Sequence, residues 1–217
     1  LDAMRDAVTD KTKVVFMTNP NNPTGCVVKQ SEVENFVRSL PENVVFCYDE
    51  AYTEYQRDPV DLRGLISEGY NVICLRTFSK IYGLAGLRIG YSYSSEEIAG
   101  YINRVREPFN VNSLAQVAAL AALDDDDFVR LSRDVNDAGR KQFEKAFEEL
   151  GLEYFSDGAN FVMVKVADAP KKFVEMQKRG VIVRPNVGYG LPDWLRITIG
   201  KPEQNERCIE ELSRLVK

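Results

Sequence analysis

Histidine is absent from all 217 residues of this chain. Its absence excludes the Ser-His-Asp and Cys-His arrangements of nucleophilic enzymes, and it excludes most zinc sites. Any acid–base catalysis must therefore fall to lysine, tyrosine or a carboxylate. Cofactors that require a lysine become stronger candidates for the same reason.

Other features are scarce or missing. The chain has four cysteines without metal-site spacing, and Cys47 and Cys74 lie inside apolar runs, which favours reduced core residues over disulfide or metal roles. No run of 18 apolar residues occurs, so we expect no membrane span. A net charge of −5 gives no basic field for nucleic acid or anionic lipid. The start at Leu1 is too polar for a signal peptide, and we expect a cytoplasmic location.

The first half of the chain alternates apolar runs with helical patterns. Ser31 and Glu34 resemble a capping box that opens a helix ending near Ser39. Continuous apolar strands separated by helices are typical of a mostly parallel α/β sheet that is covered on both faces. The expected strands of this half are residues 14–18, 44–48, 72–75 and 87–93.

The second half predicts a smaller α+β unit. The acidic run at residues 124–127 favours a helix start over a metal site, because negative charge suits a helix N-terminus. We expect one domain over residues 1–112 and a connecting helix with a small domain over residues 113–217. The expected helices are residues 112–123, a long one ending near 150, 170–179 and 202 to the end, and the expected strands are 161–166, 181–183 and 195–199.

Three polar segments follow the strands of the first half. Residues 19–25 read N-P-N-N-P-T-G, residues 49–52 read D-E-A-Y, and residues 76–80 read R-T-F-S-K, followed by Gly83, Gly86 and Arg88. Ligands of open α/β sheets bind outside the carboxyl ends of the strands. Taken singly, the segments are also explained as a tight turn, a helix N-cap and a basic surface loop. The nucleotide phosphate loop G-x-x-x-x-G-K-[ST] is absent.

Together the three segments match the needs of pyridoxal phosphate (PLP). This cofactor requires a lysine for a Schiff base, a carboxylate that keeps its pyridine nitrogen protonated, and a cup for its phosphate. Its phenolic oxygen also needs hydrogen-bond donors. The chain offers all of these groups in consecutive loops at the ends of strands.

The order N-P-N-N-P-T-G, D-E-A-Y, S-K with an arginine eight residues later, and L-R-I-T resembles the class I/II aminotransferases of PLP fold type I. Within that family the chain is most similar to the histidinol-phosphate aminotransferases. The supporting stretches are residues 76–90, 180–185 and 189–200, and the resemblance covers essentially the whole chain. It implies part of a large, mostly parallel sheet domain followed by a smaller C-terminal α+β domain.

The resemblance also implies a role for each matching residue. Lys80 should hold PLP as a Schiff base, and Asp49 should pair with the pyridinium nitrogen. Arg196 should bind the anionic group of the substrate through its guanidinium, and Arg184 matches a position near the phosphate of histidinol phosphate. The other implied residues are Asn22 and Tyr52 for the phenolic oxygen, Thr77, Ser79 and Arg88 for the cofactor phosphate, Asn160 and Phe161 beside the substrate, and more weakly Tyr189.

The chain departs from the family at its beginning. Family members have a long region before the position of Leu1, which supplies a further phosphate loop, a ring stacked on the pyridine and a tyrosine for the partner subunit. We therefore interpret the chain as a fragment or a piece of a longer protein. Alone, it should expose a sheet edge and apolar surface.

The implied activity is transfer of an amino group between histidinol phosphate and 2-oxoglutarate in histidine biosynthesis, with a homodimer expected by analogy. Aromatic and aspartate aminotransferases and a threonine-phosphate decarboxylase remain alternatives. Arg184 together with Arg196 favours a phosphorylated substrate, because two guanidiniums suit a dianion. A non-catalytic regulatory module is the alternative of another class, although no helix-turn-helix segment or basic stripe is visible.

Overall fold

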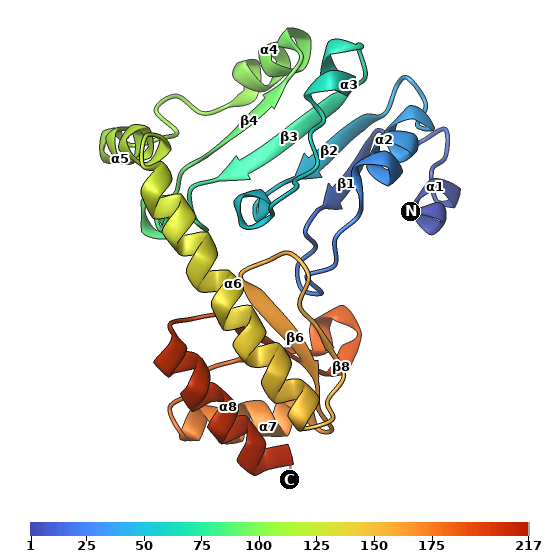
Figure 1. Ribbon diagram of the computed structural model, residues 1–217. Coiled ribbons are helices and arrows are strands. Elements are labelled where there is room, and N and C mark those ends of the chain that lie inside the picture. The colour runs from blue at the N-terminus through green and yellow to red at the C-terminus, as the bar shows by residue number, and fades with distance from the viewer. Residues whose placement is uncertain (217) are drawn as a thin grey trace. The chain divides into compact units, whose positions relative to one another are not determined.

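The computed structural model describes residues 1–216, which form two compact units (Figure 1). The N-terminal unit comprises Leu1–Pro20 and Val28–Val129. The C-terminal unit comprises Asn21–Val27 and the chain from Arg130 onward. The division into domains at residues 112 and 113 stays a prediction.

A four-stranded sheet forms the centre of the N-terminal unit (Figure 1). Its order is β1 (Val14–Thr18), β2 (Val45–Asp49), β3 (Val72–Thr77) and β4 (Gly90–Ser94). The first three strands are parallel, and β4 runs antiparallel to β3. The mostly parallel α/β architecture predicted from the apolar runs is confirmed.

Helices pack their apolar sides on one face of this sheet. The apolar positions of α2 (Gln30–Arg38) and α3 (Arg63–Ser67) lie in one core with the inward residues of β2 and β3. This core includes Val33, Phe36, Leu65, Phe46, Tyr48, Val72 and Cys74. The remaining helical elements of the unit are α1 (Asp2–Asp6), η1 (Thr53–Tyr55), η2 (Ala85–Leu87), α4 (Glu96–Val105) and α5 (Ser113–Leu123).

The C-terminal unit is an antiparallel sheet with helices on one face. The strand order is β5 (Tyr154–Phe155), β6 (Phe161–Lys165), β8 (Leu191–Thr198) and β7 (Arg184–Asn186). The helices are α6 (Asp126–Glu149), which belongs to this unit from Arg130 onward, α7 (Ala169–Lys178) and α8 (Pro202–Val216). The short η3 spans Val187–Tyr189. The core between sheet and helices includes Phe143, Phe147, Val162, Val164, Met176, Leu195, Ile197 and Leu212.

Two local predictions are wrong. Helix α2 begins at Gln30, and its capping carboxylate is Glu32, which accepts from the Lys29 amide at 3.1 Å, so Ser31 and Glu34 form no capping box. The strand predicted at 181–183 begins instead at Arg184. The reason is that the Val181 amide donates to a carbonyl of α7 and finishes that helix.

The acidic run does lie at a helix start, where Asp125 Oδ1 accepts from the Phe128 amide at 3.0 Å. The sequence patterns did not predict α3, α4 or β5. Across residues 1–216, none of the helices has both the length and the apolarity that a bilayer span requires.

Candidate active site

Polar side chains of the N-terminal unit gather at the carboxyl ends of β2 and β3. Asp49 is the last residue of β2 and Thr77 is the last residue of β3. Asp49 pairs with Leu75, and Thr77 lies two residues further along the same strand. Since side chains alternate across a strand, Asp49 and Thr77 project from the same face of the sheet.

The segment after β2 places an aromatic ring beside a lysine. Asp49 Oδ1 accepts from the Ala51 amide at 2.9 Å, so the chain turns immediately after the strand. The turn leads to Tyr52, whose side chain is buried. The Lys80 ammonium nitrogen lies 5.1 Å from the centre of the Tyr52 ring. Lys80 and Tyr52, which the sequence assigned to one site, are therefore neighbours.

The loop after β3 is closed by its own hydrogen bonds. The Ser79 amide donates to Thr77 Oγ1 at 3.0 Å, and the Phe78 amide donates to the Ile89 carbonyl at 3.2 Å. The second bond brings Arg88 next to the segment that contains Thr77 and Ser79. Arg88 is exposed and has a left-handed backbone, with φ of 56°. That conformation is uncommon for a residue other than glycine and is often found at functional sites.

The buried carboxylate of the D-E-A-Y segment is Glu50. Its side chain is inaccessible to solvent, and Arg76 Nη2 lies 2.8 Å from its Oε2. Burial opposes the charge of Arg76, but the adjoining Glu50 carboxylate outweighs it, so the pKa of Arg76 is raised. Burial and the hydrogen bond to Glu50 also raise the pKa of Tyr93. Asp49 is only half-buried and faces the other side of the sheet.

The N-P-N-N-P-T-G segment is anchored at its first residue and closed by a hydrogen bond within the segment. Asn19 is buried, and its side chain donates to Tyr48 Oη at 2.8 Å and accepts from the Val28 amide at 2.9 Å. Further along, the Gly25 amide donates to the Asn21 carbonyl at 2.7 Å. Gly25 has φ of +78°, a conformation that glycine adopts without strain. These bonds fix the loop that presents Asn22.

Asn22 and Arg196 meet within the C-terminal unit. Arg196 lies on β8, and its Nη1 donates to Asn22 Oδ1. The Arg196 guanidinium also lies 5.0 Å from the centre of the Phe161 ring, on the neighbouring strand β6. Two residues that the sequence separates by 174 positions are thus in direct contact.

Arg184 and Arg196 are directly paired across β7 and β8. Opposite residues of an antiparallel pair project from the same face, with Cβ atoms about 5 Å apart. Two like charges in this arrangement repel each other unless an anion lies between them, so the pair suits a ligand with two negative charges. Asn160 is half-buried next to Phe161, and Tyr189 is exposed at the end of η3.

The donor set of the N-terminal unit fits an aromatic phosphate ligand. A carboxylate and a hydroxyl project from one face of the sheet, an amine lies over a phenol ring, and a loop with Ser79 and Arg88 offers anion contacts. These are the groups that PLP requires: an amine to attach to, an acceptor for a protonated ring nitrogen, and phosphate ligands.

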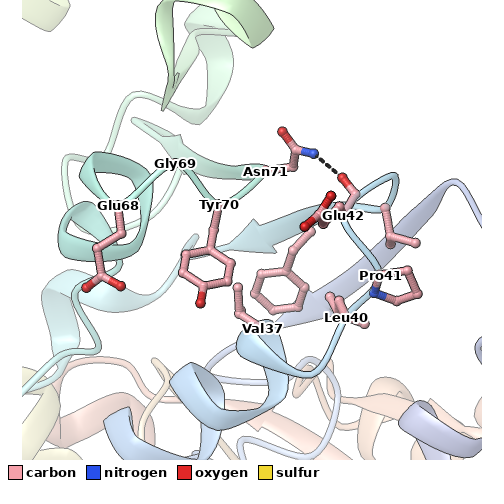
Figure 2. Close-up of a pocket in the computed structure, with 10 residues that line it drawn as sticks. Val37, Leu40, Pro41, Glu42, Glu68, Gly69, Tyr70 and Asn71 are labelled. Atoms are coloured by element: carbon pink, nitrogen blue, oxygen red, sulfur yellow. Dashed lines mark hydrogen bonds between the residues drawn. The ribbon is translucent and has the colours of Figure 1, made fainter.

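A cavity of about 630 Å³ lies at the other end of the same strands. Most of its lining residues precede β2 and β3 or come from the end of α2 (Figure 2), and Phe46 lies on β2. Asn71 donates to the Glu42 carbonyl there, at 2.7 Å. Because Asp49 and Thr77 lie at the carboxyl ends of these strands, this cavity is separate from the residues described above. The lining includes Val37, Leu40, Pro41, Glu42, Phe46, Glu68, Tyr70 and Asn71.

The sequence profile of the family aminotransferase class I and II matches residues 1–212. The chain therefore belongs to the class I and II aminotransferases. It is 48% identical over 216 residues to the histidinol-phosphate aminotransferase of Akkermansia muciniphila, with 100% of this chain and 60% of that protein covered. It is 49% identical over 221 residues to histidinol-phosphate aminotransferase 1 of Nitrosococcus oceani, again with 100% and 60% covered. The chain thus spans about 60% of the length of these relatives.

Solved structures have the same fold. The histidinol-phosphate aminotransferase from Sinorhizobium meliloti in complex with pyridoxal-5′-phosphate has a TM-score of 0.85 at 29% identity, over 94% of this chain and 57% of that chain. The enzyme from Clostridium acetobutylicum has a TM-score of 0.88 at 26% identity, over 95% of this chain and 64% of that chain. The expected PLP fold type I is therefore confirmed.

No role was predicted from the sequence for Asn19, Glu50 or Arg76. A signal for Glu50 was available, because consecutive acidic residues at the end of a strand must face opposite sides of the sheet. A buried carboxylate on the far side then requires a cation, and Arg76 on the neighbouring strand is a nearby one. No comparable signal marked Asn19, whose partners lie 9 and 29 residues away.

Proposed function

We propose that the protein is a PLP-dependent aminotransferase that moves an amino group between histidinol phosphate and 2-oxoglutarate. The observation that carries the proposal is the position of the Lys80 amine, 5.1 Å from the centre of the Tyr52 ring. Tyr52 follows the strand-end carboxylate Asp49 by three residues. A lysine over the ring of a tyrosine, in a segment that begins with a strand-end carboxylate, matches what PLP needs. The names of the relatives that share nearly half of its residues support the same activity.

Each residue then has a chemical task. When bound, PLP supplies a carbonyl carbon that amines can attach to and a pyridine ring that accepts electrons. Lys80 would hold the cofactor through Nζ and would serve as the base at the α-carbon of the amino donor. Asp49 would accept a hydrogen bond from the protonated ring nitrogen and so keep it protonated. Tyr52 donates to the phenolic oxygen.

The remaining residues orient the ligands. Asn22 accepts from Arg196 through Oδ1, which leaves its amide nitrogen able to donate to the phenolic oxygen of the cofactor. We assign Thr77, Ser79 and Arg88 to the cofactor phosphate, through hydroxyls and a guanidinium.

We assign Arg196 and Arg184 to the anionic groups of the substrates, and we assign Asn160 to the same substrate site. The direct pairing of the two arginines across β7 and β8 favours a phosphorylated amino donor over phenylalanine or aspartate.

Steady-state kinetics on the complete encoded protein test the substrate. We expect the highest kcat/KM with histidinol phosphate and 2-oxoglutarate, well above the values with phenylalanine and aspartate. Arg184→Gln should raise KM for histidinol phosphate about 10- to 100-fold, because it removes one charge-assisted phosphate contact, and should leave the rate with aspartate unchanged. Equal rates on all three donors would reject histidinol phosphate as the substrate but keep the class of enzyme.

The assembly and the location are part of the same proposal. We infer a homodimer in the cytoplasm, by analogy with relatives of this fold and from four cysteines that form no disulfide among the described residues. Light scattering behind a size-exclusion column measures the mass directly. A monomer that still turns over its substrates would overturn the dimer without affecting the proposed chemistry.

A further inference from the structure

Three side chains form a cluster on the face of the N-terminal sheet opposite Asp49. Arg76 Nε and Nη2 lie 2.9 and 2.8 Å from Glu50 Oε2. The Tyr93 hydroxyl donates to Glu50 Oε1. Glu50 follows β2, Arg76 lies on β3 and Tyr93 lies on β4, so the Glu50–Arg76–Tyr93 cluster joins three neighbouring strands.

Arg76 also connects the two segments of the candidate active site. Its Nη1 lies 3.9 Å from Glu54 Oε1, so its guanidinium is close to acidic residues on both sides of Tyr52 in the chain. Arg76 directly precedes Thr77 and lies four residues before Lys80. One guanidinium therefore ties the segment with Asp49 and Tyr52 to the loop with Lys80.

Stability alone does not account for this cluster. The Glu50 side chain has no solvent exposure and that of Arg76 has 28%, so forming the pair requires both charges to lose hydration. Buried pairs of this kind are often replaced by apolar residues without loss of stability. A geometric requirement at the end of β2 explains why charged residues are found here.

We propose that the Glu50–Arg76–Tyr93 cluster is a positioning network that holds the Asp49 carboxylate and the Lys80 amine in fixed places for the cofactor. The inference rests on the proposed function, since it concerns the same site. The network acts through the backbone: Glu50 follows Asp49 directly, and its amide donates to the Leu75 carbonyl of β3 at 2.9 Å. Its side chains lie on the far face of the sheet and act only through Asp49 and Lys80.

The chain offers a matched control at the opposite ends of the same strands. Arg38 pairs with Glu68 through two contacts of 2.6 and 3.0 Å, and its Nη1 donates to the Tyr70 hydroxyl at 3.1 Å. Arg38 lies 5.1 Å from the centre of the Tyr70 ring, as Arg76 lies 5.7 Å from that of Tyr93. Figure 2 shows Glu68 and Tyr70 beside the cavity. This second Arg–Glu–Tyr group touches no residue of the candidate active site.

The test compares both groups in the complete encoded protein. Glu50→Gln, Tyr93→Phe and the double variant Glu50→Gln/Arg76→Met are incubated without cofactor, exposed to PLP and reduced with borohydride. Mass spectrometry then follows labelling of Lys80 over time. We expect labelling and kcat to fall about 10- to 100-fold while KM changes less than about threefold, because misplacement affects the reaction geometry more than binding. Glu68→Gln and Glu68→Gln/Arg38→Met should match the unaltered protein.

The double variant separates positioning from stability. It removes both buried charges, so its melting temperature should return toward that of the unaltered protein while labelling of Lys80 stays slow. Recovery of labelling together with stability would overturn the proposal. If the double variant does not fold, Tyr93→Phe, which deletes one hydroxyl, gives the same comparison.

A readout without cofactor separates this inference from the proposed function. The Ala51 amide donates to Asp49 Oδ1, so its signal in protein labelled with ¹⁵N-alanine reports the place of that carboxylate. We expect the signal to shift in Glu50→Gln and to stay in Glu68→Gln. An unshifted signal in the variants of the cluster would overturn the positioning network. Failure of the unaltered protein to acquire PLP on Lys80 would overturn the proposed function instead, whatever the amide shows.

Discussion

Two adjacent carboxylates at the end of β2 lie in different surroundings. Asp49 is half-buried and accepts a hydrogen bond from the Ala51 amide, whereas Glu50 is buried against Arg76. The difference follows from the alternation of side chains along a strand, which sends neighbours to opposite faces of the sheet. Two residues of the same charge therefore take different roles, one towards the proposed cofactor and one towards the neighbouring strands.

Replacement of Asp49 tests its assigned role. In Asp49→Ala we expect kcat to fall about 10²- to 10⁴-fold, the range of a lost acid–base partner, because the ring nitrogen loses the carboxylate that keeps it protonated. PLP should still attach to Lys80, so absorbance of the bound cofactor should remain while turnover is lost. Activity within threefold of the unaltered protein would show that Asp49 does not hold the ring nitrogen.

Cys208 should make stability depend on alkaline pH. Burial in α8 raises its pKa from 9.0 to about 12. The folded state then keeps a proton that the unfolded state loses, so the stabilisation is fully present below pH 9 and decreases as the pH rises toward 12. The slope from this group is at most about 1.4 kcal/mol per pH unit. Urea unfolding at several pH values between about 8 and 10.5 measures the free energy of unfolding, which should decline less steeply with pH in Cys208→Ala than in the unaltered protein. Equal slopes in the two proteins would contradict the effect assigned to Cys208.

Among the elements, α6 has a glycine that its packing requires. A Cβ at Gly139 would lie 2.5 Å from Ile199 Cγ2 and 2.7 Å from Asn205 Nδ2. The Asn205 side chain in turn accepts from the Gly200 amide at 2.8 Å, so it cannot move freely. A glycine inside a helix lowers helix propensity, and here close contact with the strand end and α8 compensates for that cost.

Alanine substitutions at two helical glycines should have effects of opposite sign. Gly139→Ala should lower the free energy of unfolding by about 1–3 kcal/mol through overpacking. Gly100→Ala in α4 meets no atom within 4 Å and should raise it by up to about 1 kcal/mol. Denaturant midpoints of both variants measure the difference. A stabilised Gly139→Ala would show that α6 does not pack as described.

Most elements could be predicted from the sequence because their apolar residues have a clear period. The parallel strands and the long helix α6 were expected from such runs. The wrong predictions lie at the ends of elements, where a single hydrogen bond determines the boundary. Glu32 with the Lys29 amide sets the start of α2, and the Val181 amide with a carbonyl of α7 sets the end of that helix. The roles of the site residues came from resemblance, whereas the contact between Asn22 and Arg196 depends on folding that brings distant residues together. No local pattern encodes such a contact.

At the scale of the whole molecule, β1 has an apolar face that the described residues do not cover. Phe16 is 70% exposed and Val14 is 45% exposed, while Met17, on the other face of the same strand, is in the core. Parallel sheets are normally covered on both faces, and β1 pairs with β2 alone in the described chain. Exposed apolar edge strands promote association.

The 217-residue chain, expressed alone, should therefore associate through β1. We expect Phe16→Lys to lower its association at a given concentration, because the substitution adds a charge at the edge strand. Val174→Lys is the matched control, since Val174 is also exposed, at 42%, but lies on α7. Sedimentation velocity over a concentration series measures both variants. The same association in Phe16→Lys as in the unaltered chain would locate the contact elsewhere.

Every role proposed for the site depends on Lys80 as the residue that forms the covalent link to pyridoxal phosphate. The direct measurement is borohydride reduction of the purified complete protein with PLP, followed by digestion and mass spectrometry of the peptide that contains Lys80. We expect a pyridoxyl group on Lys80, and in Lys80→Ala we expect no such group on this peptide and loss of turnover. Attachment of the cofactor to another lysine, or full activity of Lys80→Ala, would contradict it.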